Sequence, residues 1–379
     1  MIHNFVHACA GAGKTELIVQ RCANTVDQKR RLVITLTDSG QEELVSRLSA
    51  ACSQSQMPDV MGWYAFMIRH YVRPYLPILF PDVRPTGFIF ERDQHPKNFF
   101  RLGGIRRYFS SNGSIYKETL PELAVKVAEA MQGAVERRLG RIYDEIIIDE
   151  VQDISRKSLD VIERLLSQAI PHLILVGDVR QSLLDSDQTS SKNRSADRLG
   201  LIYWYRKHES AGLLSIKELR ETWRSNQRIA DFSDRIFPTE LGFASTNSKN
   251  QKVTGHDGVF LVHEKHLVSY LEKYHPVPLR YNKSFGTHLT GLDFTNIRKV
   301  KGFTYERVII FPTNPMLKLI ASGTPLRETS ACVFYVGVTR ARASVAIIVD
   351  DKTLTKRLRE NPFIPISVWA PGSSEQLSL

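Results

Sequence analysis

The chain has 379 residues, and its 42% hydrophobic and 24% charged content is that of a folded globular protein with room for two cores. No apolar run approaches the roughly 20 residues that cross a bilayer, and four dispersed cysteines without a C-x-x-C pair argue against a disulfide framework or a metal cluster. The formal net charge of +11 indicates a polyanionic partner such as nucleic acid, and we expect a cytoplasmic protein.

The first predicted element is a phosphate-binding loop within HACAGAGKTELIVQRC (7–22). Gly11 and Gly13 permit a tight turn after a short apolar strand, and an amphipathic helix begins at Lys14. Backbone amides and Lys14 would bind phosphate oxygens, and the Thr15 hydroxyl would ligate Mg²⁺. Ala8 stands where the general pattern has glycine, so a glycine turn that caps a core helix is the alternative. The residues expected to contact ATP are Ala8, Cys9, Ala10, Gly11, Ala12, Gly13, Lys14 and Thr15.

Cys9 lies in this loop, near a helix N-terminus and close to Lys14. Both features lower the pKa of a thiol. The sequence therefore predicts a reactive cysteine that ATP protects from alkylation, with a small packing residue as the alternative.

Two later segments interleave basic and aromatic residues: MIRHYVRPY (67–75) and KNFFRLGGIRRYF (97–109). Cations can follow the phosphates of a single strand while rings stack on its bases. Aromatic residues of this kind also fill protein cores, so the two interpretations stay open.

The next chemical signal is RIYDEIIIDEVQD (141–153), an apolar run that ends in Asp149 and Glu150. This pattern predicts a buried parallel strand, neighbouring the strand of the phosphate loop, whose carboxyl end meets the site. Asp149 would hold Mg²⁺ through water, and Glu150 would orient and deprotonate the attacking water. A second apolar strand in HLILVGDVRQSLL (172–184) ends near Gln181, which is placed to sense the γ-phosphate.

Six segments in order resemble motifs I to VI of superfamily 1 helicases of the UvrD/Rep/PcrA type, whose first motif also begins with alanine. They are AGAGKT, DEVQD, GDVRQS, RETWRSNQRIADFSD (220–234), KVKGFTYERVIIF (299–311) and FYVGVTRAR (334–342). TLTDSG (35–40) is similar to motif Ia, and GWYAF (62–66) stands in the place of the next DNA-contacting motif.

The resemblance implies an α/β protein with two RecA-like P-loop lobes, each a parallel sheet flanked by helices. Lobe 1A, with motifs I to III, would span residues 1–212 and include a reduced, mainly helical 1B-like insertion at about 64–139 and a mobile loop at 185–198. Lobe 2A, with motifs IV to VI, would span 213–370, followed by a disordered tail at 371–379. Only 77 positions separate Arg224 from Lys301, so we expect no 2B domain.

Carried over residue by residue, the resemblance implies a catalytic set of Lys14, Asp149, Glu150, Gln181, Arg224 and Arg340. The two arginines would come from the second lobe as arginine fingers. Thr15 and Asp149 would hold Mg²⁺, and Trp223, Arg224, Gly302 and Arg340 would complete the ATP site. The expected DNA contacts are Thr37, Trp63, Tyr64, Arg69 and Arg73, with one of the two adjacent rings on a base and the other in the core.

Several positions depart from the family. The six residues before His7 cannot hold the glutamine that reads adenine, and Trp223 replaces the usual base-stacking tyrosine, so we expect loose base choice. In motif V, Phe303 and Thr304 replace the usual Leu-Glu, and Arg298 replaces a histidine.

Two functions of different classes fit these observations. The first is an ATP-dependent translocase or helicase on single-stranded nucleic acid, moving 3′ to 5′ as the family does. The second is an ATP- and DNA-binding regulatory subunit of a nuclease complex, similar to the helicase-like partner in Gabija-type antiphage systems. No nuclease motif is visible in the sequence, so cutting would require a partner protein, and the choice between DNA and RNA stays open.

Overall fold

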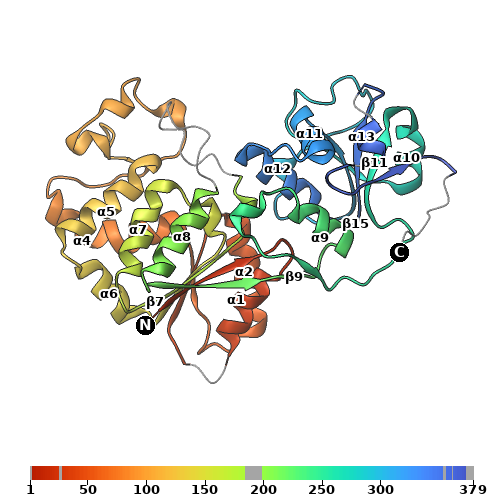
Figure 1. Ribbon diagram of the computed structural model, residues 1–379. Helices are drawn as coiled ribbons and strands as arrows, with labels where there is room; N and C mark the ends of the chain where they lie inside the picture. Colours follow the sequence, from red (N-terminus) through yellow and green to blue (C-terminus); the bar gives the residue numbers. More distant parts are fainter. Residues whose placement is uncertain (1, 25–27, 184–198, 353–355, 361, 373–379) are drawn as a thin grey trace.

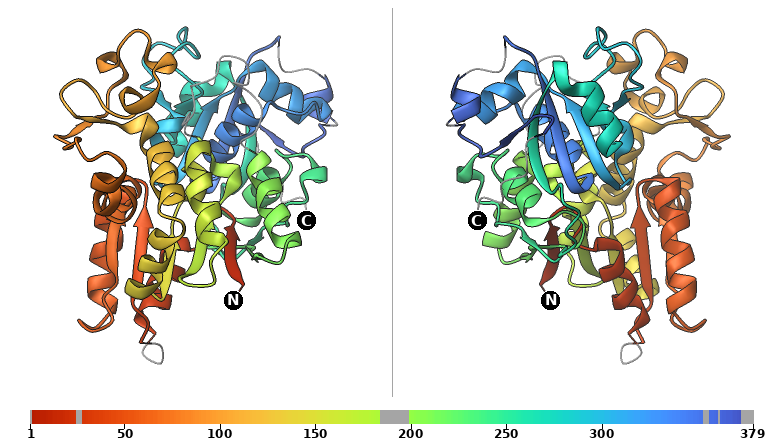
Figure 2. Two further views of the ribbon diagram at one scale, coloured as in Figure 1. Left: turned by 90° about the vertical axis from the view of Figure 1, so that its left-hand side faces the viewer. Right: turned by 90° about the vertical axis from the view of Figure 1, so that its right-hand side faces the viewer.

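The computed structural model describes residues 2–24, 28–183, 199–352, 356–360 and 362–372. They form two α/β lobes, which stand side by side in Figure 1 and are seen from both sides in Figure 2. Each lobe is built on a six-stranded sheet in which every pairing is parallel, so the expected pair of RecA-like lobes is confirmed. Within the described ranges, no helix combines the length and the apolar character that a membrane crossing requires.

The sheet of the first lobe has the strand order β3-β2-β6-β7-β1-β8. Its strands are β1 (His3–Ala8), β2 (Arg31–Thr35), β3 (Asp59–Gly62), β6 (Glu145–Ile148), β7 (His172–Gly177) and β8 (Leu214–Leu219). Side chains along a strand alternate between the two faces. Val33 and Ile147 therefore pack with helices α1 (Lys14–Ala23) and α2 (Asp38–Ala51), whereas Leu32 and Ile146 pack on the opposite face.

That opposite face is covered by α5 (Leu120–Ala130), α6 (Ala134–Ile142), α7 (Arg156–Leu166) and α8 (Gly200–Ser210). The sequence-based boundary of the lobe at residue 212 is wrong, because β8 pairs with β1 along its whole length. The first sheet therefore ends at Leu219. The carboxylate strand β6 is also not the direct neighbour of β1, since β7 lies between them.

The predicted insertion has two helical ends and a different middle. It begins with α3 (Trp63–Phe66), a π-helical segment (Met67–Val72) and α4 (Arg73–Leu79), and it returns through α5 and α6. These ends share the core of the first lobe. Residues 80–119 project from the lobe (Figures 1 and 2) and contain only short 3-10 turns, β4 (Phe88–Ile89) and β5 (Ile115–Tyr116), so the projecting part is not mainly helical.

The second sheet has the order β13-β12-β14-β15-β11-β16. Its strands are β11 (Gly258–His263), β12 (Val277–Arg280), β13 (Thr295–Asn296), β14 (Tyr305–Phe311), β15 (Ala341–Val349) and β16 (Ser367–Trp369). Helices α9 (Gln227–Asp234), α11 (Asn314–Ser322), α12 (Glu328–Val338) and α13 (Lys356–Glu360) pack on one face, and α10 (Leu267–Tyr274) packs on the other.

The chain passes from β8 to α9 through β9 (Glu221–Thr222), which forms a short parallel pair with β10 (Asn247–Ser248), a strand that follows α9. The predicted mobile loop at 185–198 and residues 373–379 of the predicted tail lie outside the described residues.

Candidate nucleotide site between the lobes

The phosphate loop joins β1 to α1 and has the backbone that its glycines predict. Gly11 and Gly13 have φ angles of +78° and +77°, in the left-handed region that favours glycine. A side chain at Gly11 would also collide with the second half of the chain, since its Cβ would lie 2.6 Å from the Cβ of Arg224. No side chain caps the N-terminus of α1. Amides at an uncapped helix N-terminus suit phosphate oxygens, so the loop fits a nucleotide.

The two carboxylates follow β6 directly. Lys14 Nζ lies 3.4 Å from Glu150 Oε1, which brings the loop and the end of β6 together. Glu150 has a φ of +52°, a conformation uncommon outside glycine that occurs at strained functional positions. The peptide is held by a hydrogen bond of 2.8 Å from the Glu150 amide to Asp149 Oδ1.

The electrostatics of the pair fit a bound cation. Burial and the neighbouring Glu150 raise the pKa of Asp149, and this carboxylate forms no ion pair with a side chain that the structure describes. A divalent cation would supply the missing charge, and Thr15 at the start of α1 offers a hydroxyl ligand. Burial raises the pKa of Glu150, but the ammonium groups of Lys14 and Lys301 outweigh it and hold that pKa below its usual range.

Lys301 is a site residue that the sequence analysis did not single out. Its Nζ lies 3.4 Å from Glu150 Oε2 and contacts Asp153 Oδ2 more closely. Burial lowers the pKa of Lys301, yet Glu150 and Asp153 raise it further, so the net direction is upward. The sequence feature that marks Lys301 is its position directly before Gly302 in KGFT, within the segment that resembles motif V.

Gln152, the glutamine of DEVQD, was also missed. Its Nε2 donates to Glu150, and its Oε1 accepts a 3.0 Å hydrogen bond from the Asp178 amide. A Cβ at Gly177 would lie 2.4 Å from that Oε1 and 2.8 Å from a methyl carbon of Val151, so any side chain there would displace Gln152 or Val151. Gln152 therefore ties Glu150 to the end of β7.

The two arginines reach this place from the second half of the chain. Arg340 is only 1% exposed, and its Nη2 donates to Gln181 Oε1 at 3.1 Å. Arg224 donates to the carbonyl of Thr339 at 3.1 Å. Burial and the nearby Arg224 lower the pKa of Arg340 to about 9. Arg340 is buried and Arg224 is half-buried, and an anion between the lobes would relieve the repulsion between their guanidinium groups.

Trp223 and Gly302 lie at the margin of the site. The Trp223 amide donates to the Gly11 carbonyl at 3.0 Å, while its ring is 67% exposed and open to a base. Gly302 has a φ of +91° and precedes Phe303, whose carbonyl accepts a 3.2 Å hydrogen bond from Arg340. The structure thus gathers the six residues of the predicted catalytic set, whose roles stay predictions.

The predicted DNA contacts divide into two groups. Trp63 as a DNA contact is wrong, because its ring is 3% exposed and its Nε1 donates to Ser158 in the core. Tyr64 is half-buried, with Lys117 Nζ 5.1 Å from its ring centroid. Thr37 caps α2 and is exposed, as are Arg69 and Arg73.

The prediction of a reactive Cys9 is also wrong. The thiol is 3% exposed, and burial raises its pKa to about 12 although the nearby Arg180 and Lys14 oppose this. Desolvation therefore raises the pKa of this thiol by more than the helix N-terminus and the neighbouring lysine lower it.

We accordingly expect Cys9 to resist alkylation in the folded protein, because a buried thiol is neither accessible nor ionised. Peptide mass spectrometry after brief iodoacetamide treatment measures this directly. Cys52, which is less buried, serves as the internal control and should be labelled first. Labelling of Cys9 at the rate of Cys52 would contradict the burial argument.

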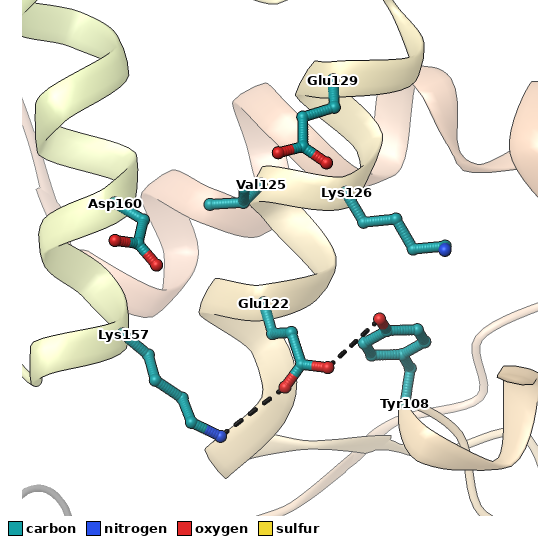
Figure 3. Close-up of a pocket in the computed structure, with 7 residues that line it drawn as sticks. All are labelled: Tyr108, Glu122, Val125, Lys126, Glu129, Lys157 and Asp160. Carbon is teal, nitrogen blue, oxygen red and sulfur yellow. Dashed lines mark hydrogen bonds and ion pairs between the residues drawn. The ribbon is translucent and has the colours of Figure 1, made fainter. Parts of the chain in front are cut away.

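A separate cleft of about 390 Å³ lies between α5 and α7 (Figure 3). Its lining contains no residue of the nucleotide site, and within it Glu122 pairs with Lys157 and accepts from Tyr108. The Glu122 carboxylate therefore already has partners, and we assign this cleft no part in the nucleotide chemistry.

Three comparisons with known proteins found proteins similar to this chain. Residues 3–186 match the family model of an AAA domain. The chain is 28% identical over 105 residues to a subunit of the ATP-dependent helicase/nuclease of Oenococcus oeni, a match that covers 27% of this chain and 8% of that relative. Two solved structures of Arterivirus nonstructural protein 10, a helicase, align with 92% of this chain at 16% identity, with TM-scores of 0.45 alone and 0.43 in complex with DNA.

The chain spans 59% and 61% of those two helicase chains and a small fraction of the helicase/nuclease relative. The AAA-domain match over the first lobe, the helicase/nuclease relative and the two parallel sheets together support a superfamily 1 helicase-like fold.

Proposed function

We propose that the chain is a nucleic-acid-dependent ATPase that moves along a single strand. One observation carries the proposal: Lys14 from the first lobe and Arg224 and Arg340 from the second half gather around one phosphate loop, beside an ionised Glu150. Positive groups from two lobes around a half-buried carboxylate suit phosphoryl transfer, in which charge develops on the transferred group.

In this proposal each residue has a defined task. The loop amides and Lys14 bind the phosphates, and Thr15 and Asp149 hold Mg²⁺, which neutralises phosphate charge when bound. Glu150 takes the proton of the attacking water while the water oxygen bonds to the γ-phosphorus and the bond from that phosphorus to the bridging oxygen breaks, which releases ADP and phosphate. Arg224 and Arg340 stabilise the departing charge, so hydrolysis depends on the second lobe, and closure and opening of the lobes drive movement.

The nucleic acid would run over the carboxyl end of the first sheet and onto the projecting segment. Residues 64–119 contain nine Lys and Arg against four Asp and Glu, a net +5. Lys117 lies between two rings, 5.1 Å from Tyr64 and 5.7 Å from Phe90, and Phe90 is 54% exposed. Exposed rings beside cations favour single strands, and we propose DNA with 3′ to 5′ movement.

A nuclease partner is the second part of the proposal, supported by the helicase/nuclease protein found among the relatives. ATP turnover with and without single-stranded DNA tests the ATPase, and a strand-displacement assay separates a motor from a regulatory switch. Stimulated turnover with strand displacement supports the motor. DNA binding without stimulated turnover would instead favour the regulatory role, and absence of turnover under all conditions would overturn the ATPase.

We expect the enzyme to accept several nucleotide bases. The exposed ring of Trp223 can stack on any base, and stacking does not read the hydrogen-bonding edge that separates adenine from guanine. Turnover of ATP, GTP, CTP and UTP should therefore give kcat/KM values within about tenfold of one another. A preference for ATP of about a thousandfold would show that an unassigned group reads the base.

Tyr64→Ala is expected to weaken single-strand binding by about 1–3 kcal/mol, the usual contribution of one stacked base. DNA-stimulated turnover should fall with it, while turnover without DNA stays at the parent rate. Fluorescence anisotropy with a labelled oligonucleotide at several salt concentrations measures the affinity. Tyr203→Ala removes an exposed ring on α8 and is the control. Equal single-strand affinities of the two variants would show that the strand does not contact Tyr64.

A further inference from the structure

One residue of the phosphate loop is held from outside the loop at both of its polar groups. The amide of Ala10 donates to the hydroxyl of Tyr335 at 3.2 Å. The carbonyl of Ala10 accepts from the hydroxyl of Thr222 at 2.7 Å. Tyr335 lies on α12 of the second lobe and Thr222 on β9, so these two bonds attach the loop to the second half of the chain beside the bond from the Trp223 amide to the Gly11 carbonyl.

The Tyr335 hydroxyl has a second partner. It donates to Asp178 Oδ2 at 3.1 Å, and the same oxygen accepts from Gln181 Nε2 at 2.9 Å. Gln181 in turn accepts from Arg340 at 3.1 Å, and Arg340 follows α12 only five residues after Tyr335. These hydrogen bonds link Tyr335 to Arg340 through Asp178 and Gln181, and both ends of the link lie near the carboxyl end of α12.

The same end of α12 also holds the other arginine. Both the amide and the hydroxyl of Thr339 donate to the Tyr335 carbonyl, at 2.9 Å and 2.8 Å, and the Thr339 carbonyl accepts from Arg224. The Tyr335 ring is buried and fixed by the Arg180 guanidinium, 4.7 Å from its centroid, and by Phe237. A fixed ring leaves its hydroxyl little freedom to adjust.

We propose that Tyr335 is a positioning residue that sets the separation between the phosphate loop and the two arginines in the arrangement of the lobes that the structure shows, with Thr222 as its second anchor. The proposal rests on the proposed ATPase function. The phenol is suited to the task because its oxygen accepts from Ala10 and donates to Asp178 at the same time. Phenylalanine would keep the ring packing but leave a buried amide and a buried carboxylate each without this partner.

Tyr335→Phe tests the proposal, with Tyr71→Phe as the matched control. The Tyr71 hydroxyl is also fully buried, but it has no hydrogen-bond partner among the described residues. We expect kcat for ATP to fall about 10- to 100-fold in Tyr335→Phe, with KM within about threefold of the parent value. Tyr71→Phe should keep the parent kcat. A role in packing alone would change the melting temperature of both variants and the kcat of neither.

A second variant keeps the proposal testable should Tyr335→Phe fail to fold. Thr222→Val removes the other hydroxyl at nearly constant volume and should lower kcat in the same direction, whereas Thr222→Ser should restore it. Hydrogen exchange of residues 9–13 in the nucleotide-free protein gives a readout independent of hydrolysis. We expect faster exchange in Tyr335→Phe and Thr222→Val but not in Tyr71→Phe.

The outcomes separate the proposal from the function on which it rests. Parent kcat and unchanged exchange in Tyr335→Phe, in a background that hydrolyses ATP, would overturn the role of Tyr335 and leave the ATPase intact. A parent protein that hydrolyses no nucleotide would overturn the ATPase and the catalytic role of Tyr335 together. Lower kcat with faster exchange in both hydroxyl variants, and rescue by Thr222→Ser, is the result that supports it.

Discussion

Replacement of Glu150 by glutamine is expected to stop ATP hydrolysis and leave ATP bound. Glutamine keeps the size of the side chain and can adopt the same left-handed backbone, but it cannot accept the proton of the attacking water. Loss of a general base lowers turnover by about 10²–10⁴-fold. Because Lys14 and Lys301 hold the pKa of Glu150 low, the base is ionised at neutral pH in the parent protein, so the loss should be seen in full.

Lys14→Ala should abolish hydrolysis by a different route and serves as the contrast. It removes a phosphate-binding charge, so ATP affinity itself should fall, whereas Glu150→Gln keeps that affinity or increases it. Single-turnover assays with radiolabelled ATP, combined with equilibrium binding, distinguish the two variants. Substantial turnover in Glu150→Gln would remove Glu150 from the role of base, and another group would then have to accept the proton.

The outline of the fold could be predicted from the sequence for a simple reason. Buried parallel strands consist of nearly continuous apolar residues, and 145–148 and 172–177 have this pattern. The carboxyl ends of such strands meet at one edge of the sheet, so Glu150 and Gln181 were expected near the phosphate loop. Both now lie within one network that also contains Arg340.

The errors concern features that depend on packing between distant segments. Trp63 and Tyr64 are adjacent, and the positions of α7 and of the turn at 117–119 decide that Trp63 donates to Ser158 while Tyr64 meets Lys117. The pKa of Cys9 depends on how deeply the loop is covered, which no local pattern reports. The contacts of Lys301, Gln152 and Tyr335 likewise arise only when separate strand ends and lobes come together.

The boundary between the lobes also depends on packing between distant segments, which the local sequence does not report. A turn follows α8, and the sequence offers no sign that the next strand returns to the first sheet rather than starting the second. Pairing of β8 with β1 places the change of lobe immediately before Thr222 and Trp223. Only a few residues therefore separate the end of β8 at Leu219 from Arg224, which lies against Gly11.

The second large effect is expected at the arginines. Alanine at Arg224 or at Arg340 should lower turnover by about 10³-fold or more, on the scale of arginine fingers, with a smaller change in nucleotide affinity. Lysine should not rescue Arg340, because its single ammonium cannot reproduce the planar guanidinium that bonds Gln181, Val336 and Phe303 together.

The stability of these variants gives an independent check. Arg340 is buried beside Arg224, and the two charges repel one another in the nucleotide-free protein, which is why burial and Arg224 lower the pKa of Arg340 to about 9. Arg340→Ala removes that repulsion, so its loss of stability should be smaller than burial alone suggests, and bound ATP should stabilise it less than the parent. Arg342→Ala, an exposed arginine two positions later, is the matched control for turnover and melting temperature. Parent turnover in both Arg224→Ala and Arg340→Ala would mean that hydrolysis is completed within the first lobe, and the two-lobe site would have to be abandoned.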